Sequence, residues 1–185
     1  GSQMNESNMK NYVEAAKRCA VSAGYDWLIL TTHAYHETGG FEHIVGRNNY
    51  WGLKKPLKSS WFGMVATVWT REYEDIKEGE TVKEARIRLT KKYNLNNIIV
   101  EQSVTYRNKW LVSLPQTFRD WQTTDEAIKF YVDFIKDNYP AAFTARADYQ
   151  HYFKRLIDGN LKYATDPDYS RKCEDLYIQI KNKLK

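Results

Sequence analysis

The sequence predicts an α+β fold that is mainly helical, with a helical body and a small β-containing lobe. Near both ends of the 185-residue chain, apolar residues recur every three or four positions, which is the spacing of helices. In the middle, β-branched and aromatic residues gather in short runs that are typical of strands. Hydrophobic residues make up 42% of the chain and aromatic residues 15%, which excludes a disordered protein and favours one compact domain.

Two helices are expected at the start of the chain. Apolar residues lie along one face of residues 5–23, and Gly24 is placed to end that helix. Asp26 is suited to cap a second helix over residues 27–38, which the pair Gly39–Gly40 then stops.

The middle of the chain predicts a loop and a small sheet. Residues 41–60 are rich in Gly, Asn, Lys and His, which favours an irregular loop. Strands are expected over residues 64–73, 98–106 and 109–114. Between the first two, residues 81–93 have the pattern of an amphipathic helix.

The last third of the chain predicts three helices. A capping box opens a helix over residues 123–138, and a second helix is expected over residues 142–157. Asp166 as N-cap, with Pro167 at the first helical position, then begins a final helix that runs to Lys183.

Charge narrows the classes of partner. The chain has 28 Lys and Arg against 23 Asp and Glu, a formal net charge of +5 and a pI near 9.0. A basic, aromatic-rich surface suits polyanions or carbohydrates. No stretch is dense in Lys and Arg and no known nucleic-acid module is present, so nucleic acid is not the expected partner. Neither a membrane-spanning run nor a signal peptide is visible.

The cysteines and the first residues give little functional information. Cys19 and Cys173 lie near opposite ends, and we expect free thiols, although a pair stays open. No spacing for structural zinc occurs. Residues 1–3 look like a cloning remnant, so the native chain either begins at Met4 or is one domain of a longer protein.

Glu37 is the first candidate for chemistry. Counting back three, four and seven positions along the helix reaches the residues that share its face: Ala34, His33 and Leu30. Burial and the negative end of the helix dipole would both raise the pKa of an inward-facing carboxyl group. A carboxylic acid kept protonated in this way can protonate a departing glycosidic oxygen. The alternative is an exposed Glu at a frayed helix end.

A loop of amides and aromatic rings follows this glutamate. Asn48, Asn49 and Trp51 supply side chains that can hydrogen-bond and stack on sugars. The same residues also favour a plain turn.

Four segments resemble the bacterial glucosaminidase family, glycoside hydrolase family 73, whose members are peptidoglycan hydrolases with a lysozyme-like fold. Glu37-Thr38-Gly39 and Asn48-Asn49-Tyr50-Trp51-Gly52-Leu53-Lys54 are similar to its first two motifs. Phe118-Arg119-Asp120-Trp121 resembles its Phe-Arg-x-Tyr segment. Tyr163-Ala164-Thr165-Asp166-Pro167-Asp168-Tyr169 is similar to its Tyr-Ala-Thr-Asp-Pro-x-Tyr-Ala motif, with Ser170 in the last place.

The resemblance implies cleavage of the β-1,4 bond after N-acetylglucosamine in bacterial cell-wall glycan. It makes Glu37 the catalytic acid and Tyr163 the active-site tyrosine. The substrate-binding residues that it implies are Asn48, Asn49, Trp51 and Tyr169. Residues 5–185 would form a single catalytic domain, with a β-containing lobe at about 64–114 that carries an inserted helix. The partners would be peptidoglycan strands and anionic wall polymers, and the enzyme would act as a monomer at the cell wall, outside the cell or with a phage.

A second carboxylate is less well defined by the resemblance. Glu72, in Thr70-Arg71-Glu72-Tyr73, is similar to the family's second acidic residue and would activate water. About forty residues between Glu74 and Ser113 depart from the short lobe of the family, which leaves Glu74 and Glu101 as substitutes. Alternatively, the acetamido group of the substrate attacks and no protein nucleophile is needed.

Alternative interpretations of the sequence are a metal site, an enzyme that cuts another bond, and a non-catalytic module. His33, His36 and His43 lack the His-Glu-x-x-His spacing of zinc hydrolases, so neither metal nor cofactor is expected. His36 is expected to tune or orient Glu37. A muramidase or a lytic transglycosylase would share the fold and the glutamate, and a non-catalytic wall-binding module is a further alternative.

Overall fold

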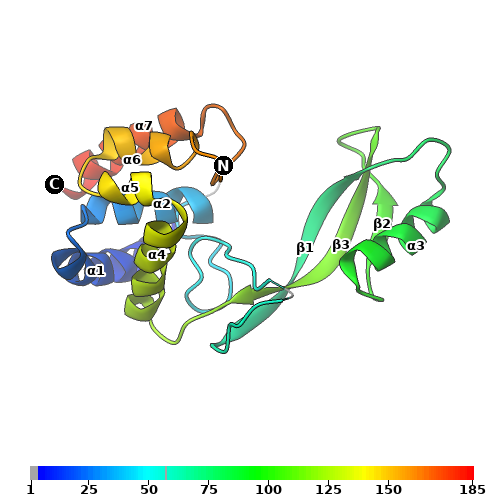
Figure 1. Cartoon of the computed structure of the whole chain (residues 1–185), viewed down its shortest axis with the longest axis horizontal. Helices are drawn as coiled ribbons and strands as arrows, with labels where there is room; N and C mark the ends of the chain where they lie inside the picture. Colours follow the sequence, from blue (N-terminus) through cyan, green and yellow to red (C-terminus); the bar gives the residue numbers. More distant parts are fainter. Residues whose placement is uncertain (1–3, 57) are drawn as a thin grey trace.

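The structure is a computed structural model that describes residues 4–56 and 58–185. Figure 1 shows a group of helices from which one arm projects. The helical body contains α1 (Glu6–Ala23), α2 (Trp27–Thr38), α4 (Thr124–Asn138), α5 (Pro140–Thr144), α6 (Tyr149–Arg155) and α7 (Tyr169–Leu184). The arm contains β1 (Val65–Asp75), α3 (Val82–Tyr93), β2 (Ile99–Gln102) and β3 (Lys109–Arg119). The expected cloning remnant at residues 1–3 lies outside the described residues.

The first two helices begin and end where the sequence predicts. The side chain of Asn5 accepts a hydrogen bond from the backbone N–H of Asn8, and Asp26 accepts one from Leu28. Gly24 and Gly39 adopt left-handed conformations at the two C-caps, with φ of 66° and 59°. These local signals fix the position of Glu37 in the last turn of α2.

Two predictions for the last third are wrong. The expected helix over 142–157 is two helices, α5 and α6, because the side chain of Asp148 accepts the backbone N–H of Gln150 and starts a new helix. Asp166 is not the N-cap of the last helix. Its side chain accepts the backbone N–H of Asp168 in a turn, and α7 begins only at Tyr169.

The arm is a three-stranded antiparallel sheet in the order β1-β3-β2. β1 and β3 pair from Val65 opposite Arg119 to Asp75 opposite Lys109. β3 is longer than predicted. β2 is shorter, because the hydroxyl of Ser103 accepts two backbone N–H groups beyond it and turns the chain.

The body and the arm have separate hydrophobic cores. The core of the arm lies between α3 and one face of the sheet and consists of Ala85, Leu89, Ile98, Trp110, Val112 and Leu114. The core of the body is rich in aromatic residues, and three of its largest fully buried side chains are Tyr12, Tyr131 and Tyr152. Most aromatic residues therefore serve as core.

Cys19 and Cys173 are free and buried, as expected. In the described part of the chain, no helix is both long and apolar enough to span a bilayer.

Candidate active site

Glu37 lies in the last turn of α2 with its side chain 22% exposed. The hydroxyl group of Tyr169, at the start of α7, donates a hydrogen bond to Glu37 Oε1 over 3.0 Å. His33 Nε2, one turn earlier on α2, lies 3.6 Å from the same oxygen. The carboxylate is therefore held by groups from α2 and α7, and the side chain stays partly exposed to solvent.

The pKa of Glu37 is shifted in the direction opposite to the sequence prediction. Burial raises this pKa, as predicted. However, the imidazole of His33 3.6 Å away, the hydrogen bond from Tyr169 and the charge of His36 together outweigh burial, and the pKa of Glu37 falls below its usual value. The prediction failed because it contained burial and the helix dipole but none of the donors that the fold brings to the carboxylate.

His33 occupies the centre of a buried polar cluster. Its side chain is fully buried, with Nε2 2.7 Å from the hydroxyl of Tyr169 and Nδ1 hydrogen-bonded to the hydroxyl of Tyr131 on α4. The hydroxyl of Tyr131 lies 2.8 Å from that of Tyr152, which lies 3.0 Å from that of Tyr25. The sequence prediction missed this cluster, since nothing in the local pattern distinguishes these tyrosines from other core residues.

Tyr163 lies behind His33, with the two ring centroids 4.5 Å apart. Its hydroxyl is buried, and it has no hydrogen-bond partner among the described residues. Burial and the charge of Glu37 raise the pKa of Tyr163 well above its usual value. The structure thus brings Tyr169 of the fourth motif to Glu37, and Tyr163 to the imidazole of His33.

His36 lies beside Tyr169, with ring centroids 5.1 Å apart. Burial lowers the pKa of His36, although the charge of Glu37 acts against it. His43 is exposed. Within residues 4–56 and 58–185, no group of three or more His, Cys, Asp or Glu is arranged to hold a metal ion.

Asn49 has a structural role that leaves its side chain no capacity for the expected sugar contact. It is fully buried. Its amide nitrogen donates to the backbone oxygens of Leu53 and Arg119, and its side-chain oxygen accepts from the backbone of Trp51 and Leu53. These four bonds use the whole capacity of an asparagine amide. The prediction that Asn49 binds sugar is therefore wrong in this structure.

Asn48 and Trp51 are held in the same way. Asn48 donates to the backbone oxygen of Trp121, and its side-chain oxygen accepts from the hydroxyls of Tyr50 and Thr124. Trp51 is 5% exposed and stacks on Tyr131 with ring centroids 4.7 Å apart, so neither ring face is free for a sugar. The predicted contact of Trp51 is thus corrected to a support of the loop. Asn48 is only half-buried and donates one hydrogen bond from its amide within the described residues, so its contact with sugar stays a prediction.

Asp120 holds the other side of this loop. In the sequence this residue is only part of the third motif, and no role is predicted for it. It is 3% exposed and accepts backbone N–H groups from Arg47, Asn48 and Trp121. Gly46 lies so close that a Cβ there would stand 2.4 Å from Asp120 Oδ2. The loop between α2 and β1 is thereby fastened to the end of β3.

Glu72 lies on β1, on the side of the sheet that faces α3, since it pairs with the buried Val112. Its side chain is 37% exposed. Lys54 Nζ at 3.4 Å and Gln116 Nε2 at 2.9 Å both contact Oε1. No contact between Glu72 and Glu37 is present among the described residues.

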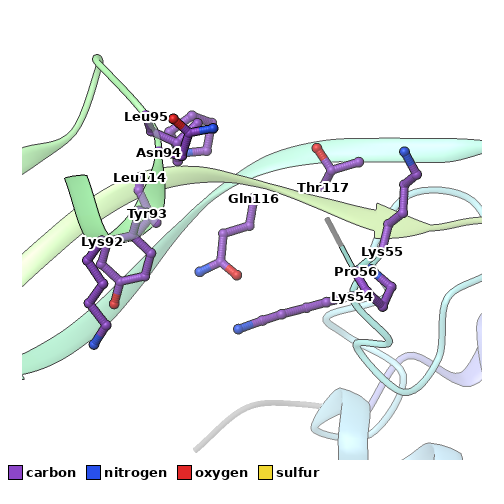
Figure 2. A pocket seen from close by; sticks show the side chains of 11 residues that line it. Lys54, Lys55, Pro56, Lys92, Tyr93, Asn94, Leu95, Leu114, Gln116 and Thr117 are labelled. Atoms are coloured by element: carbon purple, nitrogen blue, oxygen red, sulfur yellow. The ribbon is translucent and has the colours of Figure 1, made fainter. Parts of the chain in front are cut away.

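A cavity of about 360 Å³ lies on this side of the arm. It is lined by Lys54 and Lys55, by the end of α3 at Lys92 to Leu95, and by Leu114 to Thr117 of β3. Figure 2 shows the side chains of Lys54 and Gln116 pointing into the same space. The surroundings of Glu72 are therefore open and rich in lysine.

The two substitute carboxylates are placed differently. Glu74 is 13% exposed and is bound by Lys92 and Tyr93. Burial raises its pKa, but these two hydrogen bonds outweigh burial and lower it. Glu101 pairs with Leu111, so it faces the side of the sheet opposite to Glu72. Of the three, Glu72 is the carboxylate that is both accessible and on the side of the cavity.

Comparison with known families gives one match. The glucosaminidase family model, described as mannosyl-glycoprotein endo-beta-N-acetylglucosaminidase, matches residues 13–182. A search of curated proteins finds no matching sequence.

Solved structures resemble the chain along nearly its whole length. The truncated glycoside hydrolase domain of FlgJ from Salmonella typhimurium has a TM-score of 0.62 at 20% identity, covering 96% of this chain and 97% of that one. A peptidoglycan hydrolase mutant from Sphingomonas sp. A1 has a TM-score of 0.59 at 20% identity, with 94% and 92% covered. The catalytic domain of the autolysin Auto from Listeria monocytogenes has a TM-score of 0.57 at 15% identity, with 98% and 89% covered. This similarity confirms the predicted fold class.

Proposed function

The chain belongs to the glucosaminidase family of glycoside hydrolases, and on that premise we propose that it cleaves the β-1,4 bond after N-acetylglucosamine in peptidoglycan strands. Two kinds of observation support peptidoglycan as the substrate. The four sequence motifs resemble those of the cell-wall enzymes of this family, and the solved structures of similar fold include peptidoglycan hydrolases and an autolysin.

Glu37 is proposed as the general acid. The observation that carries this role is its place at the end of α2, where 22% of the side chain is exposed and Tyr169 fixes one carboxyl oxygen. A glycosidic oxygen can approach the exposed part. As the bond from the anomeric carbon to this oxygen breaks, the proton of Glu37 passes to the oxygen and leaves a carboxylate.

Tyr163 is proposed to contact the substrate or the reaction centre. Its hydroxyl group lacks a partner among the described residues although it is buried, and an unpaired buried hydroxyl is costly. The charge of Glu37 contributes to its raised pKa, which is consistent with a position near the carboxylate. A sugar hydroxyl or acetamido group would supply the missing partner once the side chains that cover this hydroxyl move aside. Tyr169, whose hydroxyl already binds Glu37, is proposed to act on the acid and not on the sugar.

Glu72 is proposed to activate the attacking water. Lys54 and Gln116 both bind Oε1 and orient the side chain, and within the described chain no hydrogen bond engages Oε2. An inverting enzyme would bring the two carboxyl groups to roughly 6.5–9.5 Å with substrate bound. If the acetamido group of the substrate attacks instead, Glu72→Gln keeps most of the activity.

The positive charge of the chain has a secondary role in this proposal. A net charge of +5 would attract the enzyme to anionic wall polymers, and salt would weaken that attraction. The proposed place of action is accordingly the cell wall.

The central test is Glu37→Gln, assayed on purified cell walls. Glutamine keeps the size of the side chain but cannot donate the acid proton, so lysis should fall by roughly 10²–10⁴-fold with the thermal unfolding temperature unchanged. Glu14→Gln, an exposed change on α1, serves as the matched control and should be fully active. Near-normal lysis by Glu37→Gln would refute the assignment of the acid.

The bond that is cut needs a second measurement. Digested peptidoglycan is reduced with borohydride and its new ends are identified. Glucosaminitol ends support a glucosaminidase. Muramitol ends would identify a muramidase, and anhydro-muramic ends a lytic transglycosylase.

A further inference from the structure

A continuous chain of hydrogen bonds leads from Glu37 into the helical body. Behind Glu37 it passes through Tyr169, His33, Tyr131, Tyr152 and Tyr25. The side chains of His33, Tyr131 and Tyr152 are 0% exposed, and the two outer tyrosines are also buried. Residues from α2, α4, α6, α7 and the turn after α1 thus meet in one polar network inside an otherwise apolar core.

The direction of each hydrogen bond follows from the state of Glu37. When Glu37 is a carboxylate it can only accept, so Tyr169 donates its single proton to Oε1. His33 Nε2, 2.7 Å from the oxygen of Tyr169, must then carry a proton and donate it. In a neutral imidazole, Nδ1 is left as an acceptor, and the hydroxyl of Tyr131 satisfies it.

The remaining tyrosines fix that arrangement. Since Tyr131 donates to His33, its oxygen accepts from Tyr152, whose oxygen in turn accepts from Tyr25. The chain therefore has one polarity, with every proton pointing toward Glu37. Phe153, whose ring centroid lies 6.3 Å from that of His33, shows that rings without a hydroxyl also fit this core.

We infer that His33 is a positioning residue that stabilises the carboxylate left on Glu37 after it has protonated the leaving oxygen. It acts through the hydroxyl of Tyr169 and directly from 3.6 Å, and the tyrosines hold its proton on the nitrogen that faces Glu37. The inference rests on the proposed role of Glu37. The catalytic proton itself comes from Glu37, and no bond to His33 breaks.

The groups around this pair are consistent with the role. The titratable side chains that face His33 or Glu37 are His36 on α2, Tyr131 on α4, Tyr163 before α7, and Tyr169 and Cys173 on α7. Burial raises the pKa of Glu37, whereas His33 and Tyr169 are the main groups that lower it. Removing either should therefore make Glu37 a weaker acid.

The test measures kcat/KM against pH on a soluble peptidoglycan fragment for His33→Phe, Tyr169→Phe and His33→Gln. A general acid is active while protonated, so activity falls as pH rises through its pKa. A residue that lowers the pKa of the acid therefore shifts the alkaline limb of the kcat/KM profile to lower pH than it would have without that residue. In His33→Phe and Tyr169→Phe the limb should move to higher pH by about one unit, and the maximal kcat should fall up to about tenfold. His33→Gln, whose amide can donate in place of Nε2–H, should lie between wild type and His33→Phe.

Tyr12→Phe is the matched control. Tyr12 is fully buried and its hydroxyl donates to the backbone of Leu30, outside the chain that leads to Glu37. This variant should keep the wild-type limb. If His33→Phe does not fold, His33→Gln tests the role of His33, and Tyr169→Phe, which removes one oxygen atom, shows how much of the shift comes from the direct bond to Glu37.

Two failures can be told apart. An unmoved alkaline limb in His33→Phe and His33→Gln, alongside an inactive Glu37→Gln variant, would overturn the role of His33 and leave the acid in place. An active Glu37→Gln variant would instead overturn the proposed function on which the inference rests.

Discussion

At the residue scale, the loop between α2 and β1 shows how one side chain can look like a ligand contact and serve as a support. Asn49 binds backbone groups of Trp51, Leu53 and Arg119 and has no remaining capacity. The same amide chemistry that would recognise a sugar hydroxyl recognises these peptide groups. The loop therefore contributes to the site by holding its scaffold in place.

This role predicts a stability effect for Asn49→Asp. The substitution keeps the shape but replaces the donating NH₂ with a carboxylate oxygen that faces two carbonyl oxygens. We expect a loss of about 3 kcal/mol in the free energy of unfolding, because buried acceptors lose their donor and a charge is buried. Chemical denaturation checks this, with Asn97→Asp, an exposed position, as the control of equal charge. Weaker glycan binding at unchanged stability would favour a sugar contact instead.

At the element scale, one carboxylate joins the start of α3 to the sheet of the arm. Glu80 accepts two hydrogen bonds from Arg88 on α3 and one from Trp110 Nε1 on β3. The hydrogen bonds from Arg88, and secondarily that from Trp110, lower the pKa of Glu80 to about 2. The ionised form is thus the one that the folded arm prefers.

The pH dependence of this contact has a definite sign. Because the folded pKa is lower than the unfolded value, the stabilisation is complete above the usual glutamate pKa of 4.5 and is lost as pH falls toward about 2. Thermal unfolding should show Glu80→Gln below wild type at pH 7, with the difference shrinking across this window. Glu78→Gln, at an exposed neighbouring position, should match wild type throughout. A difference that does not change with pH would contradict the prediction.

At the scale of the whole molecule, the separate cores predict that the arm can open without the body. The arm core shares no residue with the helical core, and Figure 1 shows the arm extending away from the helices. Trp110→Ala removes the largest side chain of the arm core and should destabilise the arm by roughly 3–5 kcal/mol. Hydrogen exchange should then accelerate in α3, β2 and β3, while α1 and α2 stay protected.

Trp69→Ala is the control for this prediction. Trp69 lies on β1 in the same arm, but 56% of it is exposed. Its removal should leave exchange in α3 close to that of wild type. Equal acceleration throughout the chain in Trp110→Ala would show that body and arm unfold as one unit.

Local signals account for what could be predicted of the fold. The caps and glycine stops of α1 and α2 depend on neighbours within a few positions, and they placed Glu37 correctly at the end of a helix. The wrong start of α7 and the missed break before α6 have a similar cause. In both places a short polar side chain had a choice of nearby N–H groups, and the sequence does not show which it takes.

Local sequence patterns were enough to identify the family, the order of most helices and strands, and the glutamate that is proposed as the acid. The groups that surround this glutamate depend on how the helices pack. Tyr169 binds Glu37, 132 positions away, and also His33, 136 positions away, while Asn49 binds a backbone group 70 positions away. A periodic pattern reports which side chains turn inward, but hydrogen-bond partners are set by packing between distant helices, and these partners reversed the expected pKa shift of Glu37.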